Sequence, residues 1–113
     1  MLSLILIIED PALHHDAERR ILGRTTIRVA DGDGLADHFR AVPTLPIDCP
    51  VGWYDDQGLT DIPTDPYGFP LTWAPAFLLA AAGGGGIGLT PWNHAVLALL
   101  MGLGETRVIL RWD

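Results

Sequence analysis

Three side chains able to bind a metal ion recur at intervals of four residues near the start of the chain: Asp10, His14 and Glu18. Residues four apart lie on one face of a helix, and carboxylate and imidazole groups are ligands for ions such as zinc. The sequence therefore offers a candidate metal site that would need further ligands. The alternative is a solvated helix face on which Asp10 caps the helix.

Two further sets of residues are of types found in catalytic or nucleotide-binding sites, but they lack the full sequence pattern of such a site. Cys49 with His38 or His94 as base has the chemistry of a nucleophile, although a buried thiol is the simpler interpretation. The glycines from Gly83 to Gly88 satisfy G-x-G-x-x-G, yet they follow an alanine-rich helical run and not a strand. The chain also has no lysine for a phosphate-binding loop. We expect no cofactor, and whether the protein is an enzyme stays open.

Charge is distributed unevenly: no charged residue occurs from Pro66 to Gly104, and the 113-residue chain carries a net charge of −7. Glycines and Pro91 interrupt the uncharged stretch, so neither apolar run in it reaches the roughly 20 residues of a membrane span. We interpret the stretch as core or as protein interface. The acidic balance argues against nucleic acid as a partner. A single cysteine, Cys49, fits a reducing compartment and predicts a cytoplasmic protein.

The elements that must position these residues begin with the strands of a small mixed sheet. Leu2–Ile8 is a continuous apolar run, which suits a central strand covered on both faces. Thr25–Ala30 and Arg107–Trp112 alternate in polarity, and we expect the second of them near the sheet edge. Thr44–Ile47 predicts one more brief strand.

Three to four helices are expected to pack on this sheet. Asp10 and Thr90 are each followed by a proline, which is a typical start of a helix. The last helix is apolar almost all round, so it should be fully buried or shared with another subunit. Asp31 to Gly34, at the start of the second helix, is predicted to form a turn rather than a calcium loop. The predicted helices are Pro11–Leu22, Asp33–Ala41, Ala74–Ala82 and Pro91–Met101.

The segment Asp48–Pro70 is rich in proline, glycine and aromatic residues, which predicts a long ordered loop. Large aromatic side chains can hold such a loop in a shape that serves for recognition. Together with the uncharged helices, the loop is our candidate surface for protein contact. The predicted interface residues are Trp53, Tyr54, Tyr67, Phe69, Trp73, Trp92, Ala95 and Leu99.

One local resemblance to a known family is present. Ile5–Asp10 (Ile-Leu-Ile-Ile-Glu-Asp) resembles the first strand and acidic pair of response-regulator receiver domains, and Val29–Gly32 resembles their second strand and the following turn. The resemblance implies that Glu9 and Asp10 bind magnesium and that Asp48 lies near the phosphoacceptor position. It ends at about Asp48, and the switch residue and lysine of the family cannot be placed.

Taken together, these patterns predict a single α+β domain over residues 1–113, with a small mixed sheet, three to four helices and a long proline-, glycine- and aromatic-rich loop. The function that they favour is a small acidic protein-binding or regulatory protein. It would bind a partner protein or itself as a homo-oligomer. The alternative is a small enzyme or a ligand- or metal-binding protein that uses the His and Asp cluster and the glycine loop.

Overall fold

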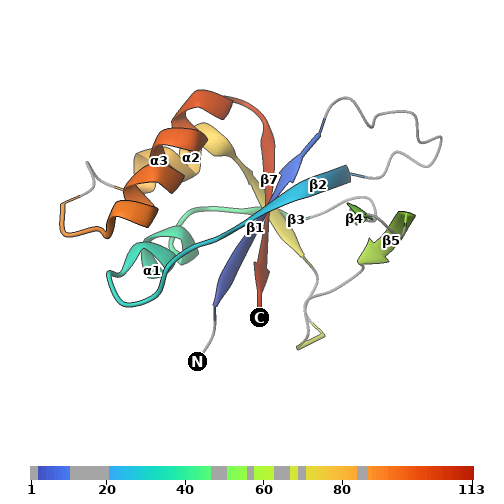
Figure 1. Cartoon of the computed structure of the whole chain (residues 1–113), viewed down its shortest axis with the longest axis horizontal. Helices are drawn as coiled ribbons and strands as arrows, with labels where there is room; N and C mark the ends of the chain where they lie inside the picture. Colours follow the sequence, from blue (N-terminus) through green and yellow to red (C-terminus); the bar gives the residue numbers. More distant parts are fainter. Residues whose placement is uncertain are drawn as a thin grey trace.

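The computed structural model describes residues 3–10, 21–46, 51–55, 58–62, 67–68, 71–83 and 87–113. Within them, the strands form one mixed sheet in the order β3-β6-β7-β1-β2-β4-β5 (Figure 1). The strands are β1 (Leu4–Glu9), β2 (Ile21–Arg28), β3 (Leu45–Pro46), β4 (Val51–Asp55), β5 (Gly58–Ile62), β6 (Thr72–Pro75) and β7 (Arg107–Trp112). The helices are α1 (Leu35–Arg40), α2 (Ala76–Ala82) and α3 (Pro91–Leu103).

β1 is the central strand, as its apolar sequence predicts. It pairs antiparallel with β2 on one side and with β7 on the other, and β6 continues the antiparallel pattern beyond β7. Leu6 and Ile8 join the core under the helices, whereas Ile7 points to the opposite face of the sheet because side chains alternate along a strand. All three are buried, so β1 needs apolar residues on both faces.

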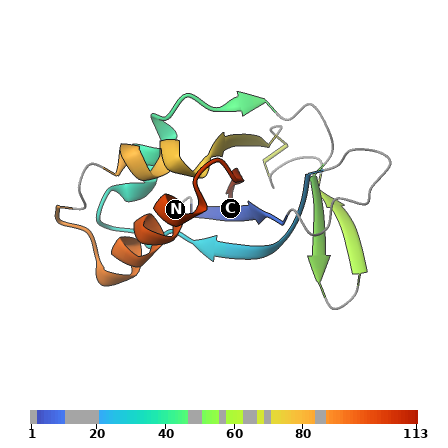
Figure 2. The ribbon, with the colours of Figure 1, turned by 90° about the horizontal axis from the view of Figure 1, so that it is seen from above.

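The three helices cover one face of the sheet and lie away from the β4–β5 hairpin (Figures 1 and 2). Phe39 of α1, Leu79 of α2 and Leu100 of α3 are fully buried, and they share one core with strand residues such as Leu6 and Val108. Burial of these apolar side chains is the main favourable contribution to folding. The predicted α+β class is therefore confirmed, with an antiparallel centre made of β6, β7, β1 and β2.

α3 begins where the sequence predicts. The Thr90 hydroxyl accepts a hydrogen bond from the backbone N–H of Asn93 at 3.2 Å, and Pro91 occupies the first helical position. The helix extends beyond the predicted end at Met101 to Leu103. It stops at Gly104, whose φ of 58° suits glycine.

The prediction that Arg107–Trp112 lies near the sheet edge is wrong, because β7 lies between β1 and β6. β6 was not predicted, since part of it falls in the apolar run Ala74–Ala82 that favoured a helix throughout. α2 begins only at Ala76, after Pro75 in an extended conformation. A strand with neighbours on both sides explains why Val108, Ile109 and Leu110 are all buried.

The first predicted helix, Pro11–Leu22, is wrong at its end: Ile21 and Leu22 belong to β2, and residues 11–20 lie outside the described residues. Gly23 lies within the same strand. A Cβ at Gly23 would lie 2.7 Å from the Ile8 carbonyl oxygen, where the pairing of β1 with β2 shifts register. Glycine is needed there because the two backbones approach too closely for a side chain.

The long loop predicted over Asp48–Pro70 is not confirmed, because β4 and β5 pair within it as an antiparallel hairpin. β4 also pairs parallel with β2, which makes the sheet mixed. The prolines and glycines favoured a loop, but the β-branched and aromatic residues between them suit strands once β2 provides a neighbour. The brief strand predicted within Thr44–Ile47 is confirmed as β3, and the helix predicted from Asp33 to Ala41 as α1.

The strand arrangement does not match a receiver domain. Receiver domains have doubly wound sheets of parallel strands, whereas β1 is antiparallel to both of its neighbours. The similarity of Ile5–Asp10 to that family is therefore a property of one short strand. The role that it implied for Glu9 and Asp10 in binding magnesium loses its structural basis.

Candidate functional site

A buried polar cluster centred on Asn93 holds α3 to the sheet. The Asn93 amide oxygen accepts from the backbone N–H of Ala30 at 2.9 Å, and its Nδ2 donates to the Ala30 carbonyl at 3.0 Å. Nδ2 also lies 2.8 Å from each carboxylate oxygen of Asp33. Asn93 is fully buried, so each of these bonds replaces one that water would otherwise make.

Asp33 links the same cluster to two backbone segments. Its carboxylate accepts from the N–H of Thr90 at 2.8 Å and from the N–H of Leu35 at 3.1 Å. Burial alone raises the pKa of Asp33, but these hydrogen bonds and that from Asn93 outweigh it and hold the pKa below the usual 3.8. The segment Asp31–Gly34 is thus a turn, as expected, and its Asp33 bonds to the protein itself.

The side of α3 that faces solvent carries no charged residue. Trp92, Leu99 and Met101 are 56%, 41% and 71% exposed, while the helix buries Asn93, Val96 and Leu100. Full burial of this helix is therefore wrong as a prediction, and the expected sharing with another subunit is untested. We call the exposed set the α3 outer face: Trp92, His94, Ala95, Ala98, Leu99, Met101 and Gly102.

Three of the predicted interface residues meet in one shallow groove of about 200 Å³ on this face. Its lining residues are Ile27, Trp92, Ala95, Val96 and Leu99. The Trp92 Nε1–H donates to the carbonyl of Arg28 at 2.6 Å, which fixes the indole against β2 and satisfies its polar atom. The surface that the ring presents to solvent is consequently apolar.

Trp73 lies elsewhere, on β6, where it is half-buried beneath Arg107. The Arg107 guanidinium carbon is 5.6 Å from the Trp73 ring centroid, and the same guanidinium binds the buried Glu9 through two nitrogens, with Nε 2.8 Å from Oε2. This arrangement of ring, cation and carboxylate ties β6, β7 and β1 together. Trp73 therefore has a packing role here.

Among the predicted interface residues whose side chains the structure describes, Tyr67 does not line the groove. Tyr67 is 54% exposed beside Gly68, whose φ of 86° marks a tight turn. Trp53 and Tyr54 lie on β4, and Phe69 lies outside the described residues. The structure thus unites Trp92, Ala95 and Leu99 and separates them from the aromatic segment with which they were predicted to act.

The structure does not test the candidate metal site. His14 and Glu18 lie outside the described residues, and Asp10 follows β1 directly. Among the residues that are described, no group of three or more His, Cys, Asp or Glu side chains is placed to hold a metal ion.

The remaining chemical candidates are dispersed or packed. Cys49 lies outside the described residues, while His38 and His94 are exposed on different helices. At Gly83 an added Cβ would lie 2.5 Å from Leu97 Cδ2, so the start of the glycine run is a close contact between α2 and α3. Gly84, Gly85 and Gly86 lie outside the described residues, so the structure does not test the glycine loop as a ligand site.

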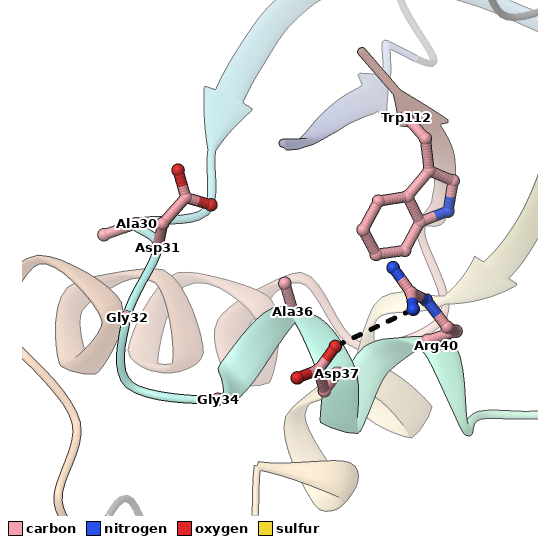
Figure 3. Close-up of a pocket in the computed structure, with 8 residues that line it drawn as sticks. All are labelled: Ala30, Asp31, Gly32, Gly34, Ala36, Asp37, Arg40 and Trp112. Carbon is pink, nitrogen blue, oxygen red and sulfur yellow. Dashed lines mark ion pairs between the residues drawn. The ribbon is translucent and has the colours of Figure 1, made fainter. Parts of the chain in front are cut away.

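A second hollow, which we call the turn pocket, has a volume of about 310 Å³ (Figure 3). The guanidinium carbon of Arg40 lies 4.5 Å from the Trp112 ring centroid, and its Nη1 is 3.9 Å from Asp37 Oδ1. No sequence pattern pointed to this pocket, because separate segments build it. The lining residues are Ala30, Asp31, Gly32, Gly34, Ala36, Asp37, Arg40 and Trp112.

No protein-family model, curated protein or solved structure matches this chain. None of the described helices is long and apolar enough to cross a bilayer. The described residues thus form an α+β protein that has an uncharged apolar helix face and a charged pocket.

Proposed function

We propose that this chain is a small acidic protein-binding protein of the cytoplasm, and that it binds a second copy of itself through the α3 outer face. The single observation that carries the proposal is the exposure of Trp92, Leu99 and Met101 on a helix without any charged residue. Exposed apolar side chains lose unfavourable contact with water when another protein covers them.

A second copy is the partner that best fits the charge distribution. The chain has a net charge of −7, so a partner recognised by charge would be basic, yet the α3 outer face offers such a partner no carboxylate. Two copies of this face can meet about a twofold axis without opposing like charges. Ala95, Ala98 and Gly102 are small, so they let two helices approach closely.

The preset position of Trp92 supports the same proposal. Its indole is held by the bond to the Arg28 carbonyl, so little side-chain freedom remains to be lost on association. Tryptophan is also among the residues that contribute most to protein interfaces. The acidic remainder of the surface disfavours binding to nucleic acid phosphates.

The test is light scattering coupled to size exclusion, together with sedimentation velocity, over a wide range of protein concentration. We expect the wild type to dimerise and Leu99→Arg to be monomeric, because the substitution buries an unpaired charge in the interface. Thr26→Arg is the matched control: it adds the same charge at an exposed position of β2 that faces the opposite side of the sheet. A monomeric wild type at high micromolar concentration would contradict the proposal, as would equal dissociation by both variants.

A further inference from the structure

We infer that the turn pocket binds a small zwitterion, an α-amino acid being the simplest member of the class. The pocket presents opposite charges at its two ends: Figure 3 shows Asp31 on one side of the hollow and Arg40, beneath Trp112, on the other. A volume of about 310 Å³ is at the lower limit of small-molecule sites, which restricts the ligand to a small one.

Arg40 is held in place without using its hydrogen-bond donors. One face of its guanidinium lies over Trp112, and the closest carboxylate oxygen, on Asp37, is beyond hydrogen-bond distance at 3.9 Å. Among the described residues no acceptor bonds to it. The in-plane N–H groups of Arg40 are therefore available to a carboxylate, whose two oxygens match the guanidinium fork.

Asp31 is held in place at the opposite end. The Ser3 hydroxyl lies 3.5 Å from Asp31 Oδ2 and accepts a hydrogen bond from Arg28 Nη2 at 2.9 Å, so Arg28 and Ser3 orient one oxygen of the carboxylate. Within the described residues, Oδ1 of Asp31 has no hydrogen-bond donor. An ammonium group is the natural donor to this oxygen.

The two ends together select for a ligand with both charges. A simple carboxylate that reached Arg40 would also meet the negative charges of Asp31 and Asp37, and a simple amine at Asp31 would meet the positive charge of Arg40. A molecule that carries an ammonium and a carboxylate satisfies each end with the opposite charge. The turn pocket shares no lining residue with the α3 groove, so this inference does not depend on the proposed self-association.

The experiment titrates the full chain, labelled with nitrogen-15, with L-alanine and its two fragments: propionate, which lacks the ammonium, and ethylamine, which lacks the carboxylate. Shifts are followed at the Trp112 indole and at the Gly32 and Gly34 amides. We expect L-alanine to give saturable shifts at these positions and the other two probes to bind at least about tenfold more weakly, because each loses one charge-assisted contact. Equal binding of propionate or ethylamine, or no saturable shift with L-alanine, would overturn the inference.

Variants locate the binding. Asp31→Asn and Arg40→Gln should each weaken the binding of L-alanine by at least about tenfold, since each removes one charged partner. Glu105→Gln, at an exposed position outside the pocket, removes the same charge as Asp31→Asn and should bind like the wild type, as should Leu99→Arg. Unchanged thermal unfolding of each variant shows that the fold is intact. If Asp31→Asn and Glu105→Gln bind L-alanine equally well, the pocket is not the site.

Discussion

The α3 outer face and the turn pocket lie on either side of one buried polar cluster, yet they are built in opposite ways. The α3 outer face comes from consecutive turns of a single uncharged helix. The turn pocket combines a turn, α1 and the end of β7, and its chemistry depends on charged residues. A helix face is encoded in local spacing, whereas the pocket exists only after the strands have paired.

Asn93 joins the two surfaces. It belongs to α3, next to Trp92, and its amide binds Ala30 and Asp33, which lie in the turn that lines the pocket. The position of each surface therefore depends on the same hydrogen bonds. Variants near this junction distinguish what the surfaces share from what belongs to each.

The largest effect is expected for Asn93→Ala, which disturbs both surfaces at once. Loss of the amide leaves the partly buried N–H and carbonyl of Ala30 and the carboxylate of Asp33 without this partner, and we expect the free energy of unfolding to fall by about 2–4 kcal/mol. Chemical denaturation measures the change, and indole signals of Trp92 and Trp112 report the two surfaces separately. His94→Ala, on the exposed neighbour, should change stability by less than about 0.5 kcal/mol. Similar losses in the two variants would show that Asn93 carries no special role.

A smaller effect, confined to the helix side of the comparison, is expected for Gly83→Ala. The new Cβ would lie 2.5 Å and 2.6 Å from the two Cδ atoms of Leu97, so the end of that side chain must move, at a cost of about 1 kcal/mol. Gly102→Ala is the matched control within α3 at concentrations where the protein is monomeric, because nothing in the chain lies within 4 Å of its added Cβ. It should stabilise the protein by up to about 1 kcal/mol through higher helix propensity. Thermal unfolding of both variants gives the comparison, and a Gly83→Ala protein as stable as the wild type would contradict it.

The smallest effect is the dependence of stability on pH that comes from Asp33. Its folded pKa is below its unfolded value, so its contribution is present above the unfolded value and is lost as pH falls through the folded one. The stability advantage of the wild type over Asp33→Asn should therefore shrink below about pH 4. Denaturant unfolding at a series of pH values tests this. Asp37→Asn is the control, because it loses only an exposed ion pair. Its free energy of unfolding should stay within about 0.5 kcal/mol of the wild-type value at each pH. If Asp37→Asn shows the same acid dependence as Asp33→Asn, the loss of stability comes from surface charge in general and not from Asp33.

Local signals were sufficient for several elements. The apolar run Leu2–Ile8 predicts a central strand, and Thr90 with Pro91 predicts where α3 begins; both are confirmed. Trp92, Ala95 and Leu99, three of the predicted interface residues, lie together in the α3 groove, and their role as an interface stays a prediction. An apolar run and a helix cap each depend on residues that are close together in the chain, so both can be recognised from the sequence alone.

The sequence by itself thus determined the α+β class, the central strand and the apolar character of α3. Only the tertiary structure decided that β4 joins the sheet by pairing with β2, and that β6 inserts between β3 and β7. It also decided that Asn93 is buried and that Arg40 lies over Trp112. In each case the deciding contact joins residues far apart in the chain, and no local pattern of polarity or propensity encodes which distant partner a strand or a polar side chain will meet.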